Sequence, residues 1–519
     1  MTSRLRARKP GWSVVPLPLA ALLLLLTFGA VGLSAQPAEL DGWLRVEAGD
    51  FRLISNASPD VALRVARGLE GFRAVFGQLA PELEMASAAP TVVIAFRDAE
   101  SYAPYRHRGS VRGGKVIGEY SSHPDGNAIL LDAGGALLNA LSVVYHESVH
   151  ELIRNNFPNA PLWFHEGLAE YYSTLRLGEE AIEVGAPVER HLAWLRRQEE
   201  LGLGEVIRLP GSAKSLEETE HVGHFYAVSW LLVHHLISDQ DRGVDRLTDF
   251  LVALHEGLGP EEAFDAAFPE GVARLEEELS KILMVGTFAP STVPLAAIGG
   301  LGRLDVGSVA PAEVLTRLGF VLAHKGERDE AERHFDLALK YDPLYSGALA
   351  GLGSLRTSDR RLDEAGVWFS EAEEAGGLEA ESLLLLGRFL LVEAERAGAE
   401  GRADDRRWAI EGARGVLQAA AESFPSYVEA RALLGMTYLY EGDPEEGIRQ
   451  LVWARRRAPA RRDLAYYLVV LYARAGELER GERLLAEQLD PVEHAEMYQR
   501  ASEALEQARR RAEAASDPP

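Results

Sequence analysis

A Leu-Gly pair that recurs in the C-terminal half constrains the fold of this chain more than any other feature. The pair opens four units, at Leu318-Gly319, Leu352-Gly353, Leu386-Gly387 and Leu434-Gly435. In the first unit it is followed by small and large apolar residues and a proline, at Ala331, Phe335, Ala338 and Pro343. Small residues let the two helices of a unit approach closely, while large apolar residues bury against the next unit. The pattern therefore predicts an array of stacked helix pairs.

These offsets resemble those of tetratricopeptide repeats, from about Pro311 to Leu489. The third unit is longer, because its matching residues come 14 residues late, at Ala413, Leu417, Ala420 and Pro425. The fourth unit keeps Leu451, Ala454 and Pro459, and a fifth is recognisable through Tyr472 and Leu485. We expect an all-α tetratricopeptide-repeat solenoid over residues 311–490, then a C-terminal helix and tail over 491–519. The resemblance implies that the repeats bind a protein partner.

Composition limits the chemistry that the chain can carry. Hydrophobic residues make up 47% and charged residues 26%, which is an ordinary globular balance. The formal net charge of −25 argues against nucleic acid as a partner, because a polyanion favours positive surfaces. The chain has no cysteine, so it forms no disulfide, and a metal ion must be held by His, Asp or Glu.

The N-terminus has the pattern of a targeting segment. Arg4, Arg6, Arg8 and Lys9 precede an apolar run from about Val14 to Leu33, and small residues follow. This order resembles a secretory signal, although a run of about 20 residues is also long enough to span a bilayer. Pro16 and Pro18 shorten the run and favour a cleaved signal. We expect a signal peptide or N-terminal membrane anchor over residues 1–36, and export to the periplasm or cell envelope.

The region before the repeats mixes strand and helix patterns. Short apolar or β-branched runs at 51–54, 91–96 and 128–131 predict strands, and helical spacing over 61–79 predicts a helix between the first two. From residue 137 onward the spacing predicts helices, at 137–155, 162–174, 189–201, 223–238 and 245–256. We therefore expect an α+β domain with a small N-terminal sheet over 43–284. Residues 285–310, rich in Gly and Pro, are predicted to be a linker.

The helix predicted at 137–155 contains the sequence His146-Glu147-Ser148-Val149-His150. Histidines four residues apart project from one face of a helix, so both imidazoles can share a tetrahedral zinc ion. Glu147 is placed to act as general base toward a zinc-bound water, whose pKa the metal lowers. The motif alone is only moderately specific, but the surrounding helix is apolar, which argues against a plain solvent-exposed face.

The next helix begins Leu162-Trp163-Phe164-His165-Glu166-Gly167 and continues to Tyr172. HExxH followed by W-x-x-E-G-x-A-x-Y resembles the gluzincin metallopeptidases, and more narrowly the peptidase MA-like families. The resemblance implies a zincin-like catalytic domain with zinc held by His146, His150 and Glu166, and with Glu147 as general base. It also implies that Tyr226, early in a later helix, stabilises the oxyanion of the transition state.

Alternatives to these assignments follow from the same residues. His165 or Glu170 is an alternative third ligand, and Glu170, one turn beyond Glu166, fits a hydrogen-bond partner of a ligating histidine better. His224 competes with Tyr226, which is otherwise a buried helix aromatic. The strand at Ile129-Leu131 is either an edge strand that pairs with an extended peptide substrate or plain core.

Taken together, the residues predict an exported zinc metallopeptidase that acts on a peptide or protein substrate. The alternative is a non-catalytic repeat scaffold of the cell envelope with a structural or vestigial zinc site. A structural site fills all four positions from protein, whereas a catalytic site leaves one for water, and the sequence supplies three obvious ligands.

Overall fold

The computed structural model describes residue 40 and residues 42–48, 51–79, 85–106, 118–134, 137–157, 159–198, 200–209, 222–239, 242–298, 302–459 and 461–516. The chain divides into two compact units, Met1–Ala38 and Glu39–Pro519, and the described residues belong to the second. The predicted signal or anchor over 1–36 lies outside the described residues. Among the described helices, none combines the length and apolarity that a membrane crossing requires.

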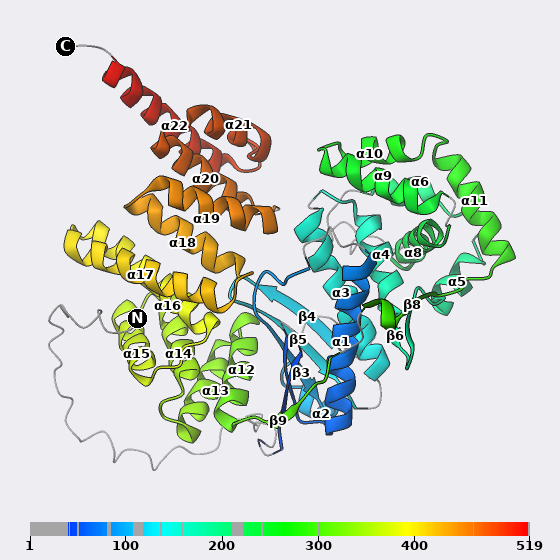
Figure 1. Ribbon diagram of the computed structural model, residues 1–519, viewed down its shortest axis with the longest axis horizontal. Helices are drawn as coiled ribbons and strands as arrows, with labels where there is room; N and C mark the ends of the chain where they lie inside the picture. The colour runs from blue at the N-terminus through cyan, green and yellow to red at the C-terminus, as the bar shows by residue number, and fades with distance from the viewer. Residues whose placement is uncertain are drawn as a thin grey trace. The chain divides into compact units, whose positions relative to one another are not determined.

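The described strands include a six-stranded mixed sheet in the order β4-β5-β3-β2-β1-β9 (Figure 1). Strands β2, β3 and β5 are parallel to one another, while β4, β1 and β9 run antiparallel to their neighbours. Their bounds are β1 Leu44–Ala48, β2 Phe51–Ser55, β3 Thr91–Phe96, β4 Gly118–His123, β5 Gly126–Asp132 and β9 Val306–Ser308. Of the two alternatives for Ile129-Leu131, the core strand is confirmed and the edge strand is wrong, because all three residues are buried and β4 pairs along the outer side of β5. Strand β4 is therefore the edge strand at this end of the sheet.

Both faces of this sheet are buried. Leu53, Val93 and Ile129 face α1 (Pro59–Leu79) and α3 (Leu137–Asn156), while their neighbours Ile54, Ile94 and Leu130 point to the opposite face. That second face packs against α12 (Pro311–His324), the first helix of the repeats. Two-sided burial explains why β3 and β5 are continuous apolar runs and do not alternate with polar residues.

Helices follow the sheet, as the spacing predicts. Their bounds are α2 Ala99–Tyr102, α4 Leu162–Ser173, α5 Glu189–Leu195, α6 Leu203–Arg208, α8 Val222–Ser238, α9 Gly243–His255, α10 Pro260–Ala267 and α11 Val272–Val285. The helix expected over 189–201 is shorter than predicted, because α5 ends at Leu195, and a separate helix, α6, begins after the left-handed Gly202. A second, three-stranded sheet joins β6 Arg176–Leu177, β7 Ala181–Val184 and β8 Ser291–Pro294.

The segment predicted as a linker, 285–310, has regular structure. It contains β8, the short 3₁₀ helix η2 (Leu295–Ile298) and β9. Strand β8 pairs with β7, and β9 adds to the six-stranded sheet beside β1. Composition misled here, because strands of three or four residues leave little hydrophobic pattern, and backbone pairing to distant strands organises the segment.

The C-terminal region consists of helix pairs, as the repeat predicts. After α12 the bounds are α13 Arg328–Tyr341, α14 Ser346–Ser358, α15 Leu362–Ala375, α16 Ala380–Ala399, α17 Ala403–Ser423, α18 Val428–Tyr440, α19 Pro444–Arg457, α20 Arg462–Ala475, α21 Leu478–Gln488 and α22 Ala495–Ser516. The 14-residue insertion lies in the third pair, where α16 has 20 residues and α17 has 21, against 14 in each of α12 and α13. Each helix of that pair is thus about two turns longer, which keeps the two helices matched in length.

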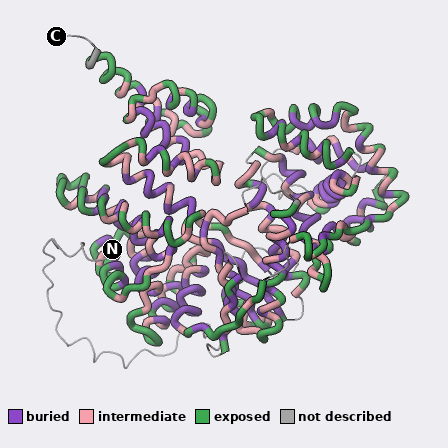
Figure 2. Tube along the Cα trace, viewed as in Figure 1, coloured by how far each residue is buried: buried purple, intermediate pink, exposed green. Residues whose placement is uncertain are grey.

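The repeat helices each have a buried side and an exposed side (Figure 2), and the buried residues are mostly small or apolar. In the first two units Phe335 and Phe369 are buried against Gly319 and Gly353, where a side chain would clash with the ring. The Leu-Gly pair of the repeat therefore marks the close approach within each unit.

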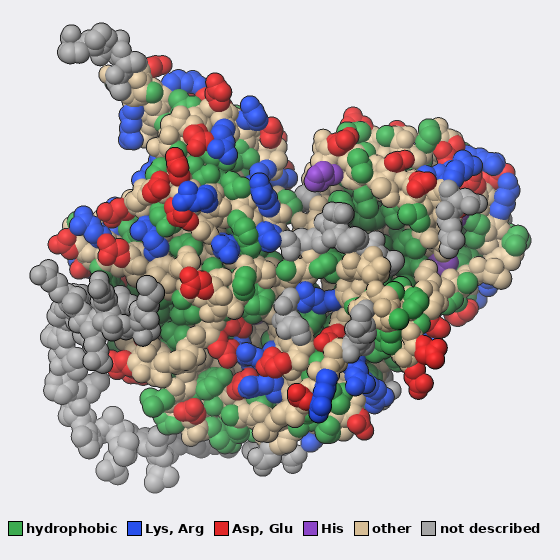
Figure 3. Space-filling model, in the orientation of Figure 1, with side chains coloured by type: hydrophobic (Ala, Val, Ile, Leu, Met, Phe, Trp, Pro, Cys, Tyr) green, Lys and Arg blue, Asp and Glu red, His purple; other side chains and the backbone are tan. Residues whose placement is uncertain are grey.

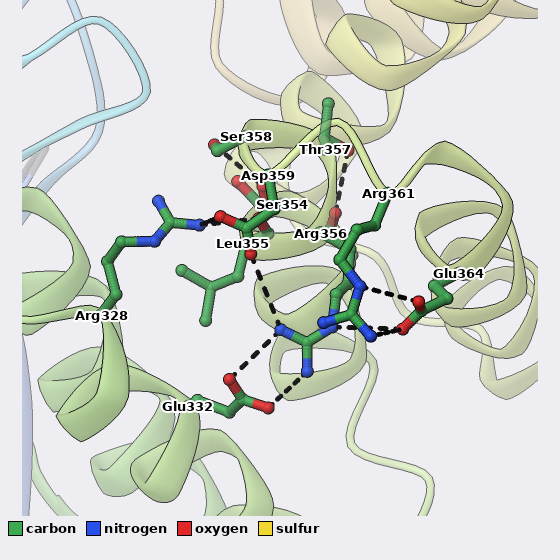
Figure 4. Close-up of polar contacts among 11 residues, drawn as sticks. Arg328, Glu332, Ser354, Leu355, Arg356, Thr357, Ser358, Asp359, Arg361 and Glu364 are labelled. Carbon is green, nitrogen blue, oxygen red and sulfur yellow. Dashed lines mark hydrogen bonds and ion pairs between the residues drawn. The ribbon is translucent and has the colours of Figure 1, made fainter.

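Ion pairs join successive units. Figure 4 shows Arg356 of α14 reaching Glu332 of α13, and Arg328 of α13 reaching Asp359 just after α14.

Candidate metal centre

Helices α3 and α4 bring three possible metal ligands together. His146 and His150 lie one turn apart on α3, and Glu166 lies on α4, which packs against α3. Each residue offers a ligand atom, and the three atoms all lie within 4.8 Å of one another. The two imidazole rings are nearly perpendicular, with centroids 4.8 Å apart. The structure therefore brings together the residues that were predicted as zinc ligands.

The position of α4 depends on a close approach to a third helix, α8. A side chain at Gly167 would place its Cβ 2.4 Å from the Ser229 carbonyl oxygen and 2.6 Å from Val233 Cγ2, both on α8. The glycine after Glu166 thus lets α8 pack directly on the helix that carries the carboxylate. This contact also brings Tyr226, one turn before Ser229, toward the histidines.

The distances fit a tetrahedral metal ion. Glu166 Oε2 lies 3.3 Å from His146 Nε2 and 3.5 Å from His150 Nε2. Two ligands that each lie about 2.0–2.1 Å from one tetrahedral zinc ion are about 3.3–3.4 Å apart. Glu166 Oε2 is buried and receives no well-formed hydrogen bond from any residue that the structure describes. A buried carboxylate oxygen of this kind needs a partner, and a cation between the two histidines would supply one.

The charged groups of the site change one another's pKa values. Burial opposes ionisation of Glu166, but the two histidines outweigh it and hold the pKa of the Glu166 carboxyl at about 2. Burial likewise opposes protonation of His146, whereas Glu166, Glu170 and Glu147 raise the pKa of its imidazole. A buried negative site flanked by two imidazoles favours a bound cation.

Glu170 lies behind His146 and is itself held in place. Its Oε1 is 3.7 Å from His146 Nδ1, too long for a direct hydrogen bond but within ion-pair range. His191 Nε2 lies 3.0 Å from Glu170 Oε2, and Arg190 donates to both carboxylate oxygens at 3.1 and 3.2 Å. The carboxylate thus faces the Nδ1 side of His146, which is where a group that supports a metal-ligating histidine would lie. Of the two alternative ligands, Glu170 takes this supporting position.

His165 and His224 take other positions. The His165 ring lies 5.8 Å from that of His150, outside the group of close ligand atoms, and burial lowers the pKa of His165 to about 4. The His224 ring packs against Trp194 at 4.7 Å. The Tyr226 ring instead lies 6.3 Å from the His146 ring. Burial, and then the charges of Glu166, Glu170 and Glu147, raise the pKa of the Tyr226 hydroxyl, so it stays a protonated donor at neutral pH.

Sequence reasoning missed Arg190 and His191. They lie on α5, about 20 residues beyond Glu170, and no fixed spacing links them to the HExxH motif. His191 is buried, but the sequence shows only a histidine within the helix predicted at 189–201. His191 reaches Glu170 because α4 and α5 both pack against α8.

Comparison with known proteins gives one family match. A family model described as a protein of unknown function, DUF1570, matches residues 140–259. The matched region includes His146, His150, Glu166 and Tyr226. No curated protein matches the chain.

Two of the solved structures that the chain resembles are described as tetratricopeptide-repeat proteins, and a third is a PilF structure. YrrB, described as a TPR protein with an unusual peptide-binding site, shares 24% identity over 37% of this chain and 92% of its own, with a TM-score of 0.30. TTC0263, a thermophilic TPR protein of Thermus thermophilus, shares 21% identity over 37% of this chain and 98% of its own, with a TM-score of 0.29. PilF of Pseudomonas aeruginosa shares 16% identity over 38% and 90%, with a TM-score of 0.29.

Proposed function

We propose that this protein is an exported zinc-dependent peptidase. The observation that carries the proposal is the group His146, His150 and Glu166, with a buried carboxylate oxygen 3.3 and 3.5 Å from two imidazole nitrogens. The resemblance of the two motifs to peptidase MA-like sequences supports the same reaction. The basic and apolar residues at the N-terminus support export.

In this proposal His146, His150 and Glu166 hold zinc, and protein fills three positions. The histidine side chains keep 16% and 12% of their surface exposed, which supports a fourth position that water can reach. Bound zinc lowers the pKa of a water molecule toward neutrality and polarises the scissile carbonyl. Glu147, half-buried beside His146, would take a proton at its carboxylate from the attacking water as the water oxygen bonds to the scissile carbonyl carbon, and would deliver that proton to the amine as the C–N bond breaks.

Tyr226 and Glu170 complete the proposed site. The raised pKa of Tyr226 keeps its hydroxyl protonated, so it donates a hydrogen bond to the oxyanion as negative charge develops. Glu170, fixed by Arg190 and His191, holds the orientation of His146. In this proposal Glu147 moves the proton, while Tyr226 stabilises the oxyanion and Glu170 holds His146 in position.

The test measures zinc and peptide cleavage separately. Wild type is expected to bind about one zinc per chain and to cleave a peptide library, and His150→Ala to lose zinc. Glu147→Gln should keep zinc but lose cleavage by a factor of about 100 or more. Glu180→Gln, an exposed glutamate in the same region, should match wild type in both measurements. Stoichiometric zinc in His150→Ala would refute the ligand assignment.

A second candidate function rests on the repeats. Five tetratricopeptide-like units are a protein-binding scaffold, and zinc in such a protein can be structural. If folded wild type binds zinc but cleaves no member of the peptide library, the scaffold function replaces the peptidase.

A further inference from the structure

The inner surface of the repeats is covered by a part of the same chain. The first helices of successive units, α12, α14, α16 and α18, pack side by side and form this surface. The turn between β4 and β5 lies against it, at Asp125. Acidic and basic side chains are interspersed over the exposed faces of the repeats in Figure 3, whereas the contacts of this turn are largely buried.

Asp125 is bound by three different units. His324 Nε2 of the first unit lies 3.0 Å from Asp125 Oδ2, and Arg388 of the third lies 3.9 Å from the same oxygen. The fully buried Tyr427, at the start of the fourth unit, donates its hydroxyl to the Asp125 carbonyl at 2.6 Å. Burial raises the pKa of Asp125, but His324 and Arg388 outweigh it and hold this pKa at about 2.

Two further contacts extend this surface along β4. The Lys325 ammonium, just after α12, donates to the Glu119 carboxylate in β4 and to the Tyr105 carbonyl. The rings of His123 and His324 stack with centroids 4.0 Å apart. On the other face of the same strand, the Tyr120 hydroxyl donates to Glu151 of α3, the residue after the predicted ligand His150. Strand β4 is thus held between the repeats and the predicted zinc helix.

We propose that the inner surface of repeat units one to four binds the chain's own β4–β5 turn, and that it thereby positions β4, the edge strand, beside α3. Lys325 and Tyr427 are positioning residues in this arrangement. A separate protein reaches the part of this surface that His324, Arg388 and Tyr427 line only by displacing the turn. The consequence for substrate, that β4 lies beside a peptide bound at the candidate metal centre, rests on the proposed function, whereas the binding of the turn does not.

The experiment measures hydrogen exchange in the full chain, without substrate. Lys325→Met and Tyr427→Phe, singly and together, should speed amide exchange in residues 118–132 about tenfold, while residues 44–55 exchange as in wild type. Lys340→Met and Tyr341→Phe are matched controls, because both residues are on α13 and Tyr341 is exposed. If the double variant does not fold, amide exchange at 118–132 is compared between wild type and Tyr427→Phe alone, which removes only one hydroxyl.

Unchanged exchange at 118–132 in both single variants would overturn the proposal, and so would equal acceleration in the control variants. A peptide-cleavage assay on the same proteins separates this proposal from the proposed function. A raised KM with kcat nearly unchanged is expected in Lys325→Met if β4 positions substrate. If wild type cleaves nothing, the exchange result still decides whether the turn is bound as proposed.

Discussion

Gly167→Ala tests whether the contact between α4 and α8 sets the geometry of the candidate metal centre. A Cβ at this position would lie 2.4 Å from the Ser229 carbonyl oxygen, about 1 Å inside an ordinary contact distance. Overpacking against backbone costs about 1–3 kcal/mol, while replacing glycine by alanine in a helix contributes about 1 kcal/mol of stability. We therefore expect a net loss of up to about 2 kcal/mol in the free energy of unfolding.

Gly77→Ala in α1 isolates the packing cost. Gly77 is an exposed helical glycine, and a Cβ there would meet no described atom within 4 Å. This variant should gain about 1 kcal/mol from helix propensity alone. The difference between the two variants, measured by urea denaturation of metal-free protein, then equals the overpacking cost.

The same substitution at Gly167 should move Tyr226 relative to His146. The two helices must separate by about 1 Å, and a displacement of that size in an active site lowers kcat by a factor of up to about 100. Zinc content should fall less than kcat, because two of the three proposed ligands, His146 and His150, lie on α3, although Glu166 lies on α4 beside the substituted residue. A Gly167→Ala protein that is as stable as Gly77→Ala would refute the reasoning, since the helices would then have room for the side chain.

Three further predictions concern the metal and pH. Glu170→Gln should weaken zinc affinity about 10- to 100-fold in a chelator competition assay, because it removes the charge behind His146, and an unchanged affinity would argue against that role. Free zinc at about 1,000 times its Kd should raise wild-type stability by about 4 kcal/mol in thermal unfolding and leave His150→Ala unchanged. Burial, and then the charge of His324, lower the pKa of His123 to about 4 from 6.5. Between those pH values the unfolded chain binds more protons, so stability should fall as pH falls from 6.5 to 4, and His123→Phe should flatten this dependence in chelator-treated protein.

Much of the local structure follows from the sequence. The helix at 137–155 and the helix at 162–174 correspond to α3 and α4, because apolar residues recur at helical spacing and Pro161 stands before the second. Strong periodicity also predicted the repeats, and the 14-residue delay in the third unit appears as two longer helices. Short strands such as β8 and β9 escaped prediction, because three or four residues carry too little pattern.

The candidate site was predictable only where its residues are close in sequence. His146 and His150 share a helical turn, so local spacing predicts that they converge, whereas Glu166 was implied by the resemblance of its motif to gluzincin sequences. Arg190 and His191 on α5 reach Glu170 on α4 because both helices pack against α8. No spacing rule predicts that contact. The edge position of β4 likewise depends on pairing between strands, which a polar, Gly-rich sequence does not reveal.

The boundary between sheet and repeats is where residue patterns mislead most, and it allows a further prediction. Ile54, Ile94, Phe96 and Leu130 are fully buried against the α12 side of the sheet. Removing the repeats would expose all four side chains, at a cost of about 1.5–3 kcal/mol each, or about 6–12 kcal/mol together. A domain has only about 5–15 kcal/mol of total stability.

A chain that ends at residue 310 should therefore aggregate or bind a hydrophobic dye, although composition there predicts a linker and hence two separable domains. Replacing Ile54 and Ile94 by Thr in the shortened chain should improve its solubility, because threonine tolerates a strand position and is less apolar. Cooperative unfolding of the unmodified 39–310 fragment would contradict this reasoning. In that case the contact with α12 would be a docking surface between two independent domains, and the sheet would not depend on the repeats.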